Sequence, residues 1–198
     1  MKYLSSFLIF FLLFSNCTNK VKKEEIKVYS FDSVKSSNYL KKGMKYYNRY
    51  SYNNKNIQLL DSSVLFLKKS IENDIKNINS YENIIMLFMT KGEFESAEKY
   101  INMALNHTNQ KAYYLSKKGV VKNSLNQKDS AQYYFNLSLE RYYKKEKNLG
   151  IQNQIISILY QMGNNKQALK VIDSCILDYP KDSIYLKELK KMINSTSH

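Results

Sequence analysis

One pattern of small residues recurs along the chain, and it limits the folds that the sequence can adopt. The pattern begins at Gly92, Ala97 and Ala104, returns 34 positions later at Asn126, Ala131 and Ser138, and returns after a further 37 at Gly163, Ala168 and Cys175. Around its first occurrence, apolar residues such as Tyr81, Ile84 and Phe88 follow helical spacing. A period of this length predicts stacked units, each a pair of helices that buries its apolar faces against its neighbours.

The first residue of each triplet marks a turn between two helices. A helix commonly ends at a residue in the left-handed conformation, where Gly has no steric cost and Asn is the next best choice. We therefore expect positive φ at Gly92, Asn126 and Gly163. The other two residues of each triplet share one helical face. A large side chain there would push the paired helices apart, at a cost of roughly 1–3 kcal/mol, so we expect these positions in the core.

Composition favours helices over turn-rich folds. The chain has 198 residues with one Pro and five Gly, which argues against a sandwich or a barrel. Its formal net charge of +14 favours acidic partners, but Lys residues scattered beside Glu and Asp fit solvated helix faces better. Two cysteines are too few for a disulfide framework, and Cys175 falls where the pattern requires a buried small residue.

The 34-residue period, the turn Gly, the paired small residues and Pro180 after the last pair of helices resemble the tetratricopeptide repeat (TPR) family. The resemblance implies an all-α solenoid of about four helical hairpins with a C-terminal capping helix. We expect the TPR domain at 36–194, with units at about 36–77, 78–111, 112–148 and 149–181 and a cap at 183–194.

Two units depart from the pattern. In the first unit Gly43 takes the place that Gly119 holds in the third, and residues 50–56 are expected to form a longer turn. In the third unit, Lys118 and Lys122 stand where the second unit has apolar residues. The first helix of that unit is therefore expected to pack differently or to leave a polar gap.

The N-terminus resembles the signal of a bacterial lipoprotein. An apolar run over residues 4–14 is well short of the ~20 residues of a spanning helix, and Cys17 follows it closely. The resemblance, in a relaxed form similar to that of Bacteroidetes, implies a signal peptide at 1–16, lipidation of Cys17 and a polar tether at 17–35. It places the protein on the cell envelope, at the outer membrane. An ordinary secreted protein and an uncleaved anchor remain as alternatives.

The TPR resemblance also implies a binding groove. In this family the first helices of the hairpins line a concave surface that holds a peptide or a partner helix. Residue-by-residue matching gives the candidates Tyr47, Asn48, Met86, Met89, Tyr113, Asn123, Tyr160 and Gln161. Tyr, Asn and Met suit peptide recognition, but Met86, Met89 and Tyr160 could instead pack between helices. The set of Lys, Asn and Arg that clamps a C-terminal carboxylate in chaperone-binding members is absent from the matching positions.

No catalytic constellation is visible in the sequence. Two distant His and one buried Cys make neither a metal site nor a nucleophile pair, and there is no glycine-rich phosphate loop. We therefore expect a non-enzymatic protein without cofactor, metal or nucleic acid. The predicted function is an envelope scaffold or adaptor that binds a protein or peptide segment. The alternative is a basic surface protein that binds an anionic polymer or lipid head groups.

Overall fold

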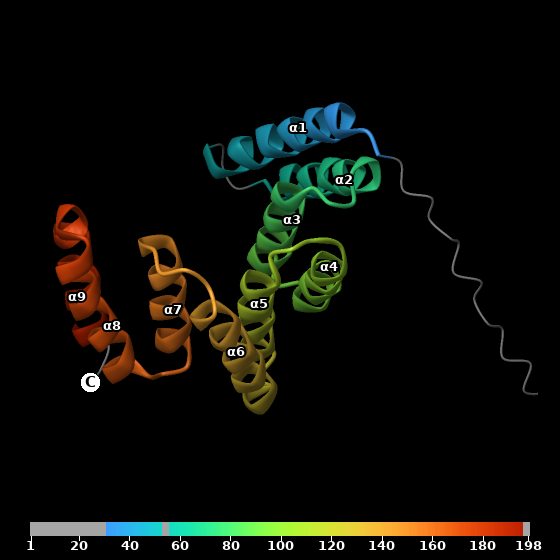
Figure 1. Cartoon of the computed structure of the whole chain (residues 1–198). Coiled ribbons are helices and arrows are strands. Elements are labelled where there is room, and N and C mark those ends of the chain that lie inside the picture. The colour runs from blue at the N-terminus through green and yellow to red at the C-terminus, as the bar shows by residue number, and fades with distance from the viewer. Residues whose placement is uncertain (1–30, 53–55, 196–198) are drawn as a thin grey trace, which may run out of the picture.

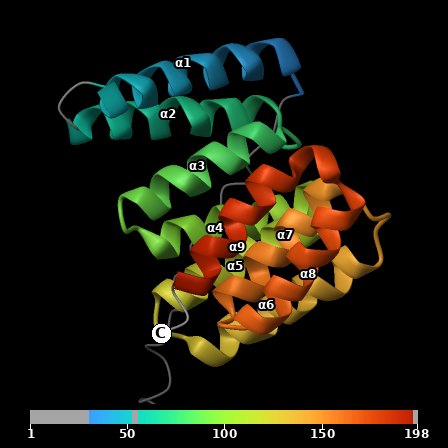
Figure 2. The ribbon, with the colours of Figure 1, turned by 90° about the vertical axis from the view of Figure 1, so that its left-hand side faces the viewer.

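The structure is a computed structural model that describes residues 31–52 and 56–195, and these residues form helices and no strands. Figure 1 shows the helices stacked in chain order, and Figure 2 shows the same stack from the side. The four hairpins are α1 (Ser33–Tyr52) with α2 (Ile57–Asn73), α3 (Ile78–Thr90) with α4 (Phe94–His107), α5 (Lys111–Ser124) with α6 (Lys128–Tyr143), and α7 (Leu149–Gln161) with α8 (Asn165–Asp178). A 3-10 turn, Pro180–Asp182, leads into α9 (Ser183–Ser195). The predicted all-α solenoid of four hairpins and a terminal helix is confirmed.

The turns inside three hairpins share one geometry. Gly92, Asn126 and Gly163 have φ of 72°, 61° and 74°, as the sequence pattern predicts. In each turn the next residue donates its N–H to a carbonyl five positions back, as Glu93 does to Phe88 at 2.9 Å. Such bonds satisfy carbonyls that the end of a helix would leave without partners.

Small residues let the two helices of a hairpin approach closely. The positions Ala97, Ala104, Ala131, Ser138, Ala168 and Cys175 are all buried. A Cβ placed on Gly119 would lie 2.6 Å from the ring of Phe135 on α6. The hydroxyl of Ser138 donates to the carbonyl of Ala112 at 2.6 Å, which joins α6 to α5.

A chain of buried serines joins the first hairpin to the second. The hydroxyls of Ser36 and Ser70 donate to each other's backbone carbonyls, at 2.9 and 2.7 Å. Because the hydrogen of Ser70 is then used, Ser80 of α3 donates to the Ser70 oxygen at 2.7 Å. Asn77 donates to the Ser36 oxygen at 2.8 Å and caps α3 by accepting from the Ser80 N–H. These contacts fix the junction of α1, α2 and α3.

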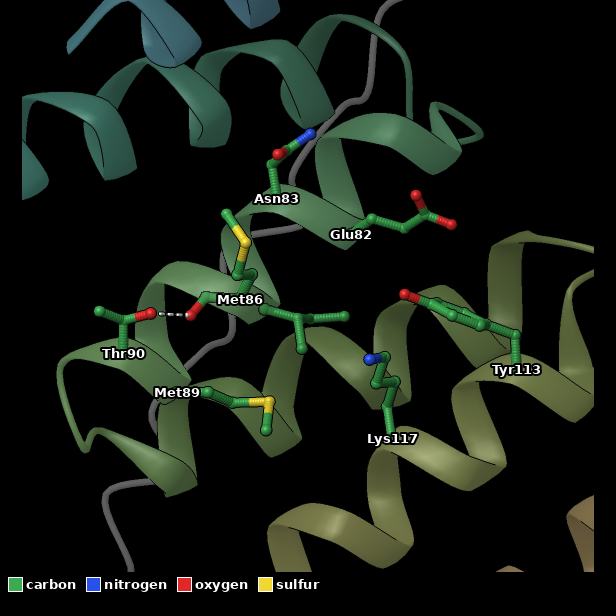
Figure 3. Close-up of a pocket in the computed structure, with 8 residues that line it drawn as sticks. Glu82, Asn83, Met86, Met89, Thr90, Tyr113 and Lys117 are labelled. Atoms are coloured by element: carbon green, nitrogen blue, oxygen red, sulfur yellow. Dashed lines mark hydrogen bonds between the residues drawn. The ribbon is translucent and has the colours of Figure 1, made fainter. Parts of the chain in front are cut away.

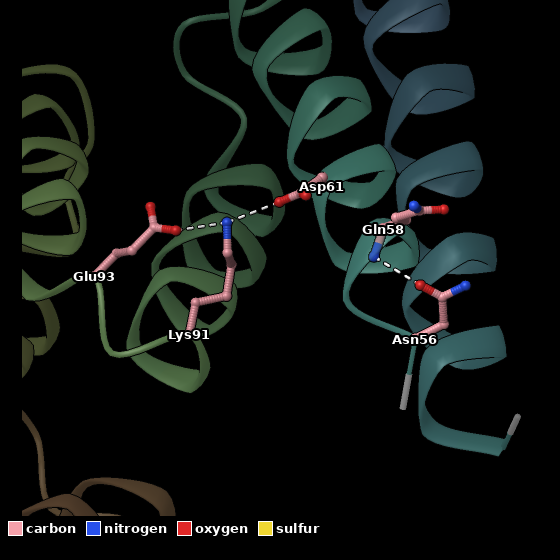
Figure 4. A network of polar contacts seen from close by, with 5 residues as sticks. All are labelled: Asn56, Gln58, Asp61, Lys91 and Glu93. Carbon is pink, nitrogen blue, oxygen red and sulfur yellow. Dashed lines mark hydrogen bonds and ion pairs between the residues drawn. The ribbon is translucent and has the colours of Figure 1, made fainter. Parts of the chain in front are cut away.

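Three polar contacts on the surface lie near the start of α2 and the end of α3, as Figure 4 shows. Lys91, just after α3, lies 2.8 Å from the carboxylate of Asp61 on α2 and 2.5 Å from that of Glu93. Asn56 caps α2 by accepting a hydrogen bond from the N–H of Gln58 at 2.9 Å. Helix α2 and the second hairpin are therefore joined outside the core as well.

The apolar core forms two clusters that meet at α5. One cluster contains buried residues of α2, α3 and α4 together with Tyr114 and Val121 of α5. The other contains Ala112 of α5 with buried residues of α6 to α9. Leu186 and Ile193 of α9 are almost fully buried, so the last helix covers the apolar face of the fourth hairpin.

Lys118 and Lys122 leave no polar gap. Lys122 lies 2.8 Å from one carboxylate oxygen of Glu98 on α4, and Lys118 lies 3.7 Å from the other. Lys118 also donates to the amide oxygen of Asn102 at 2.8 Å and lies 4.5 Å from the ring centroid of Tyr134. Of the two expectations for this helix, different packing is the one observed.

Both ends of α1 differ from the expectation. Helix α1 continues to Tyr52, into the expected turn, and begins at Ser33, inside the expected tether. The side chain of Asp32 accepts from the N–H of Lys35 at 2.8 Å, and this cap starts the helix early. The predicted signal peptide at 1–16 and Cys17 lie outside the described residues. No helix within 31–52 and 56–195 combines the length and the hydropathy needed to span a bilayer.

Candidate functional site

A pocket lies between α3 and α5, the first helices of the second and third hairpins (Figure 3). Its volume is about 520 Å³, within the range of ligand-binding clefts. The lining consists of Glu82, Asn83, Ile85, Met86, Met89 and Thr90 from α3 and Tyr113 and Lys117 from α5. We call this pocket the α3–α5 groove.

Helical spacing places these residues on one face. Glu82, Ile85, Met86 and Met89 follow one another by three, one and three positions, so they share one side of α3. The opposite side of α3, with Ile84 and Leu87, is fully buried. The pattern that packs α3 into the core therefore also presents the groove.

The floor of the groove is apolar and partly open to solvent. Met86 is 36% exposed, a large fraction for an apolar side chain on a well-packed helix. Met89 is half-buried and packs against the first core cluster, and Ile85 is buried within it. A flexible thioether at an open position can adapt to the shape of an incoming apolar side chain.

Two groups of opposite charge border this floor. Burial raises the pKa of Glu82, and attraction to Lys117 offsets part of that rise. Burial lowers the pKa of Lys117, and attraction to Glu82 opposes that shift. Within the described part of the chain, no ion pair at 4.0 Å or less joins either group to another. Both charges are therefore available to a ligand.

Tyr113 adds a hydroxyl at the edge of the groove. Figure 3 shows its hydroxyl pointing from α5 toward α3, between the ends of Glu82 and Lys117. Burial raises the pKa of Tyr113 to about 12, and the carboxylate of Glu82 adds to the rise, so the phenol stays protonated at neutral pH. The Lys117 ammonium lies 5.2 Å from the Tyr113 ring centroid. The groove thus offers a donor, an acceptor and a cation beside an apolar floor.

Two other polar side chains of the lining already donate hydrogen bonds to backbone carbonyls of α3. The hydroxyl of Thr90 donates to the carbonyl of Met86 at 3.0 Å. The amide nitrogen of Asn83 donates to the carbonyl of Asn79 at 2.7 Å. Recognition by direct polar contacts therefore falls mainly to Glu82, Tyr113 and Lys117.

The structure gathers three of the eight predicted groove residues, namely Met86, Met89 and Tyr113. Asn48 lines a separate hollow on α1. Tyr47 and Tyr160 pack against the first and second core clusters respectively.

The last two predicted groove residues, Asn123 and Gln161, also lie elsewhere. The amide oxygen of Asn123 accepts from the ammonium of Lys128 at 2.8 Å, and Gln161 is exposed at the end of α7.

Sequence reasoning missed Glu82 and Lys117. They are 35 positions apart, close to one repeat period, and such positions lie side by side on adjacent first helices. This spacing indicates that Glu82 and Lys117 face each other. A single charged residue on a helix, however, fits a solvent-exposed position equally well, so its sequence alone does not mark a binding site.

No group of three His, Cys, Asp or Glu side chains that could hold a metal ion occurs among residues 31–52 and 56–195. Cys175 is buried in the second core cluster as a free thiol. Burial raises its pKa, which keeps the thiol protonated and unreactive.

Comparison with known proteins gives one kind of match. No protein-family model matches the chain, and no curated protein matches it. Among solved structures, the chain is similar to the one described as "First TPR of Spaghetti (RPAP3) bound to HSP90 peptide SRMEEVD", with a TM-score of 0.48 and 20% sequence identity. The match covers 67% of this chain and 97% of the other. The description of the α3–α5 groove rests on the residues that line it in this structure and not on this similarity.

Proposed function

We propose that this protein is a non-catalytic scaffold of the bacterial cell envelope that holds a segment of a partner protein in the α3–α5 groove. The observation that carries the proposal is the open apolar floor at Met86 and Met89 beside the charged side chains of Glu82 and Lys117. Helical-hairpin solenoids commonly present such surfaces to other proteins.

A peptide segment suits this groove chemically. A peptide backbone carries both a donor and an acceptor at nearly every residue. The backbone N–H can donate to Glu82, and the carbonyl can accept from Lys117 or the Tyr113 hydroxyl, all of which border one pocket. An apolar side chain of the segment then covers Met86, at about 25 cal/mol for each Å² of apolar surface buried.

The attachment to the envelope is proposed from the N-terminal sequence. The apolar run at 4–14 and Cys17 fit a cleaved signal and a lipidated cysteine. A single acyl chain binds a membrane marginally, whereas two or more anchor a protein stably. The anchor would hold the groove at the outer membrane, where its partner is also expected.

Selection from a peptide library displayed on phage tests the groove. Peptides selected on the wild-type protein should bind the Met86→Ala variant roughly tenfold or more weakly, because the variant loses an apolar contact at the centre of the site. Met192→Ala is the matched control, since Met192 is 49% exposed on α9, away from the groove. Equal binding to both variants would refute the groove as the site.

Fractionation of cells tests the anchor separately. The wild-type protein should incorporate an alkyne-labelled fatty acid and sediment with membranes. Cys17→Ser should abolish the label and release the protein. Retention of the label in that variant would show that lipidation does not occur at Cys17.

A further inference from the structure

Helix α1 presents a basic face that the proposed groove does not use. The helix carries five cationic residues and no carboxylate over Ser33–Tyr52. Lys41, Lys45 and Arg49 follow one another at intervals of four, so they lie on one side. Together with the adjacent Lys42 we call them the α1 basic face. Gly43, on the opposite side of the helix, is buried against α2.

Two hollows border the α1 basic face. One has a volume of about 290 Å³ and is lined by Lys42, Lys45, Tyr46 and Arg49 with Phe66 of α2. The other measures about 440 Å³ and is lined by Lys41, Met44, Lys45, Asn48, Arg49 and Tyr52. Neither lining contains a carboxylate. Each hollow therefore offers several cations to an anionic group.

An aromatic stack lies beside Lys42 of the α1 basic face and Lys69 of α2. The ring of Phe66 lies 5.5 Å from that of Tyr46, at an interplanar angle of 9°, and 6.2 Å from that of Tyr39. The ammonium groups of Lys42 and Lys69 lie 5.7 to 5.9 Å from the centroids of Phe66 and Tyr39. Aromatic contacts hold these amines in place without neutralising their charge.

Several lysines on other described helices and turns are paired with carboxylates, unlike those of the α1 basic face. Ion pairs join Lys91, Lys118, Lys122, Lys144, Lys147, Lys190 and Lys191 to carboxylates. None of the ion pairs among the described residues uses a residue of the α1 basic face. Its positive charge is therefore concentrated and uncompensated.

Exposed apolar groups flank this charge on the same side of α1. Val34 is 72% exposed near the start of the helix, and Tyr52 is 86% exposed at its end. One face of α1 carries Val34, Lys41, Lys45 and Tyr52, because these positions are separated by seven, four and seven residues. A helix with cations between apolar and aromatic groups is suited to the boundary between lipid head groups and acyl chains.

We propose that the α1 basic face binds the phosphates of anionic lipids and lays α1 along the membrane. Charge complementarity favours an anionic surface, and position in the chain favours a membrane. Cys17 precedes Ser33 by 16 residues, which span at most about 55 Å. The choice of a membrane over another polyanion rests on the proposed lipid anchor, whereas the site itself rests on the structure.

Vesicle sedimentation tests this inference without the anchor. The protein is residues 17–198 with Cys17→Ser, which retains every described helix. The expected result is binding to vesicles of phosphatidylcholine and phosphatidylglycerol in equal parts and none to pure phosphatidylcholine. The triple variant Lys41→Gln, Lys45→Gln, Arg49→Gln should bind roughly 100-fold more weakly, since each cation near an anionic surface contributes about fivefold.

A matched variant removes the same charge elsewhere. Lys166, Lys170 and Lys187 are exposed on α8 and α9, and their replacement by Gln should leave binding within about fivefold of the parent protein, as expected for charges far from the contact. Thermal melts verify that both variants fold.

Three results would overturn the inference. They are an equal loss of binding in both triple variants, no binding of the parent protein to anionic vesicles, and binding to duplex DNA in preference to those vesicles. Each is distinct from failure of the proposed function, because peptide binding at Met86 and labelling at Cys17 are measured separately.

Discussion

At Gly119 the absence of a side chain allows α5 and α6 to pack together. A Cβ there would lie 2.6 Å from two ring atoms of Phe135, which is itself buried in the second core cluster. The same principle governs Gly43, whose Cβ would lie 3.0 Å from Leu67.

Gly119→Ala should therefore lower the free energy of unfolding by roughly 1–2 kcal/mol, because overpacking outweighs the gain in helix propensity from Ala. Adding Phe135→Leu removes the ring atoms in question. The double variant should lose less stability than the sum of the two single losses, as measured by urea denaturation. Strictly additive losses would show that the two positions do not interact.

Glu82 gives the groove a dependence on pH. Its pKa is raised by burial, so the protonated form favours the folded state. That contribution is fully present below the ordinary pKa of the carboxyl and is lost as the pH rises through the raised pKa. Glu82→Gln cannot ionise. It should gain stability relative to the wild type between pH 4 and pH 7, measured as the difference in urea midpoint.

The exposed Glu95 on α4 provides the control for this titration. Glu95→Gln should change the midpoint difference little over the same pH range. The opposite result is that the wild-type protein becomes more stable relative to Glu82→Gln as the pH rises. It would mean that attraction to Lys117 outweighs the effect of burial on the Glu82 pKa, and it would contradict the described electrostatics of the groove.

At the scale of elements, the junction of α1, α2 and α3 depends on polar contacts inside the protein. Ser36, Ser70 and Ser80 are fully buried, and their hydroxyls satisfy one another and two backbone carbonyls. A serine side chain is only slightly larger than the alanine used at close approaches elsewhere, so the three helices can meet.

Ser70→Ala should cost about 1–3 kcal/mol of stability, because it leaves the carbonyl of Ser36 and the hydroxyl of Ser80 without this partner. Ser157→Ala on α7 is the control, since Ser157 is exposed, and it should change stability by no more than about 0.5 kcal/mol. Denaturation by urea measures both. Similar small effects in the two variants would mean that the network contributes little.

The sequence predicted the hairpins because its information there is local. Apolar spacing, the turn residues Gly92 and Gly163, and buried Ala97 act within one hairpin. The predicted end of α1 was wrong. The helix continues through Tyr50 and Tyr52, because neither residue is a Pro or a Gly that would end it.

The groove was predicted only in part, because it lies between hairpins. Which residues of α3 and α5 face each other depends on how two units pack, and side chains far apart in sequence set that angle. Met86, Met89 and Tyr113 were predicted by matching positions, whereas Tyr47 and Tyr160 were assigned to the groove and do not line it. The proximity of Glu82 and Lys117 depends on the packing of α3 against α5, which their own sequence segments do not determine.

At the scale of the whole molecule, the two proposed surfaces occupy different hairpins. The α1 basic face belongs to the first hairpin, and the α3–α5 groove lies between the second and the third (Figure 1). Helix α9 closes the other end of the stack. In this account the first hairpin orients the protein on a membrane and the middle of the solenoid receives the partner.

The most direct test places a photoreactive benzophenone side chain at Met86 in the full-length protein, expressed in its own cells. Leu177, which is 81% exposed on α8, is the control position. Irradiation should give a discrete adduct of one mass from position 86 and none from position 177, because only the groove holds a partner. No adduct from position 86, or the same adducts from both positions, would contradict the account.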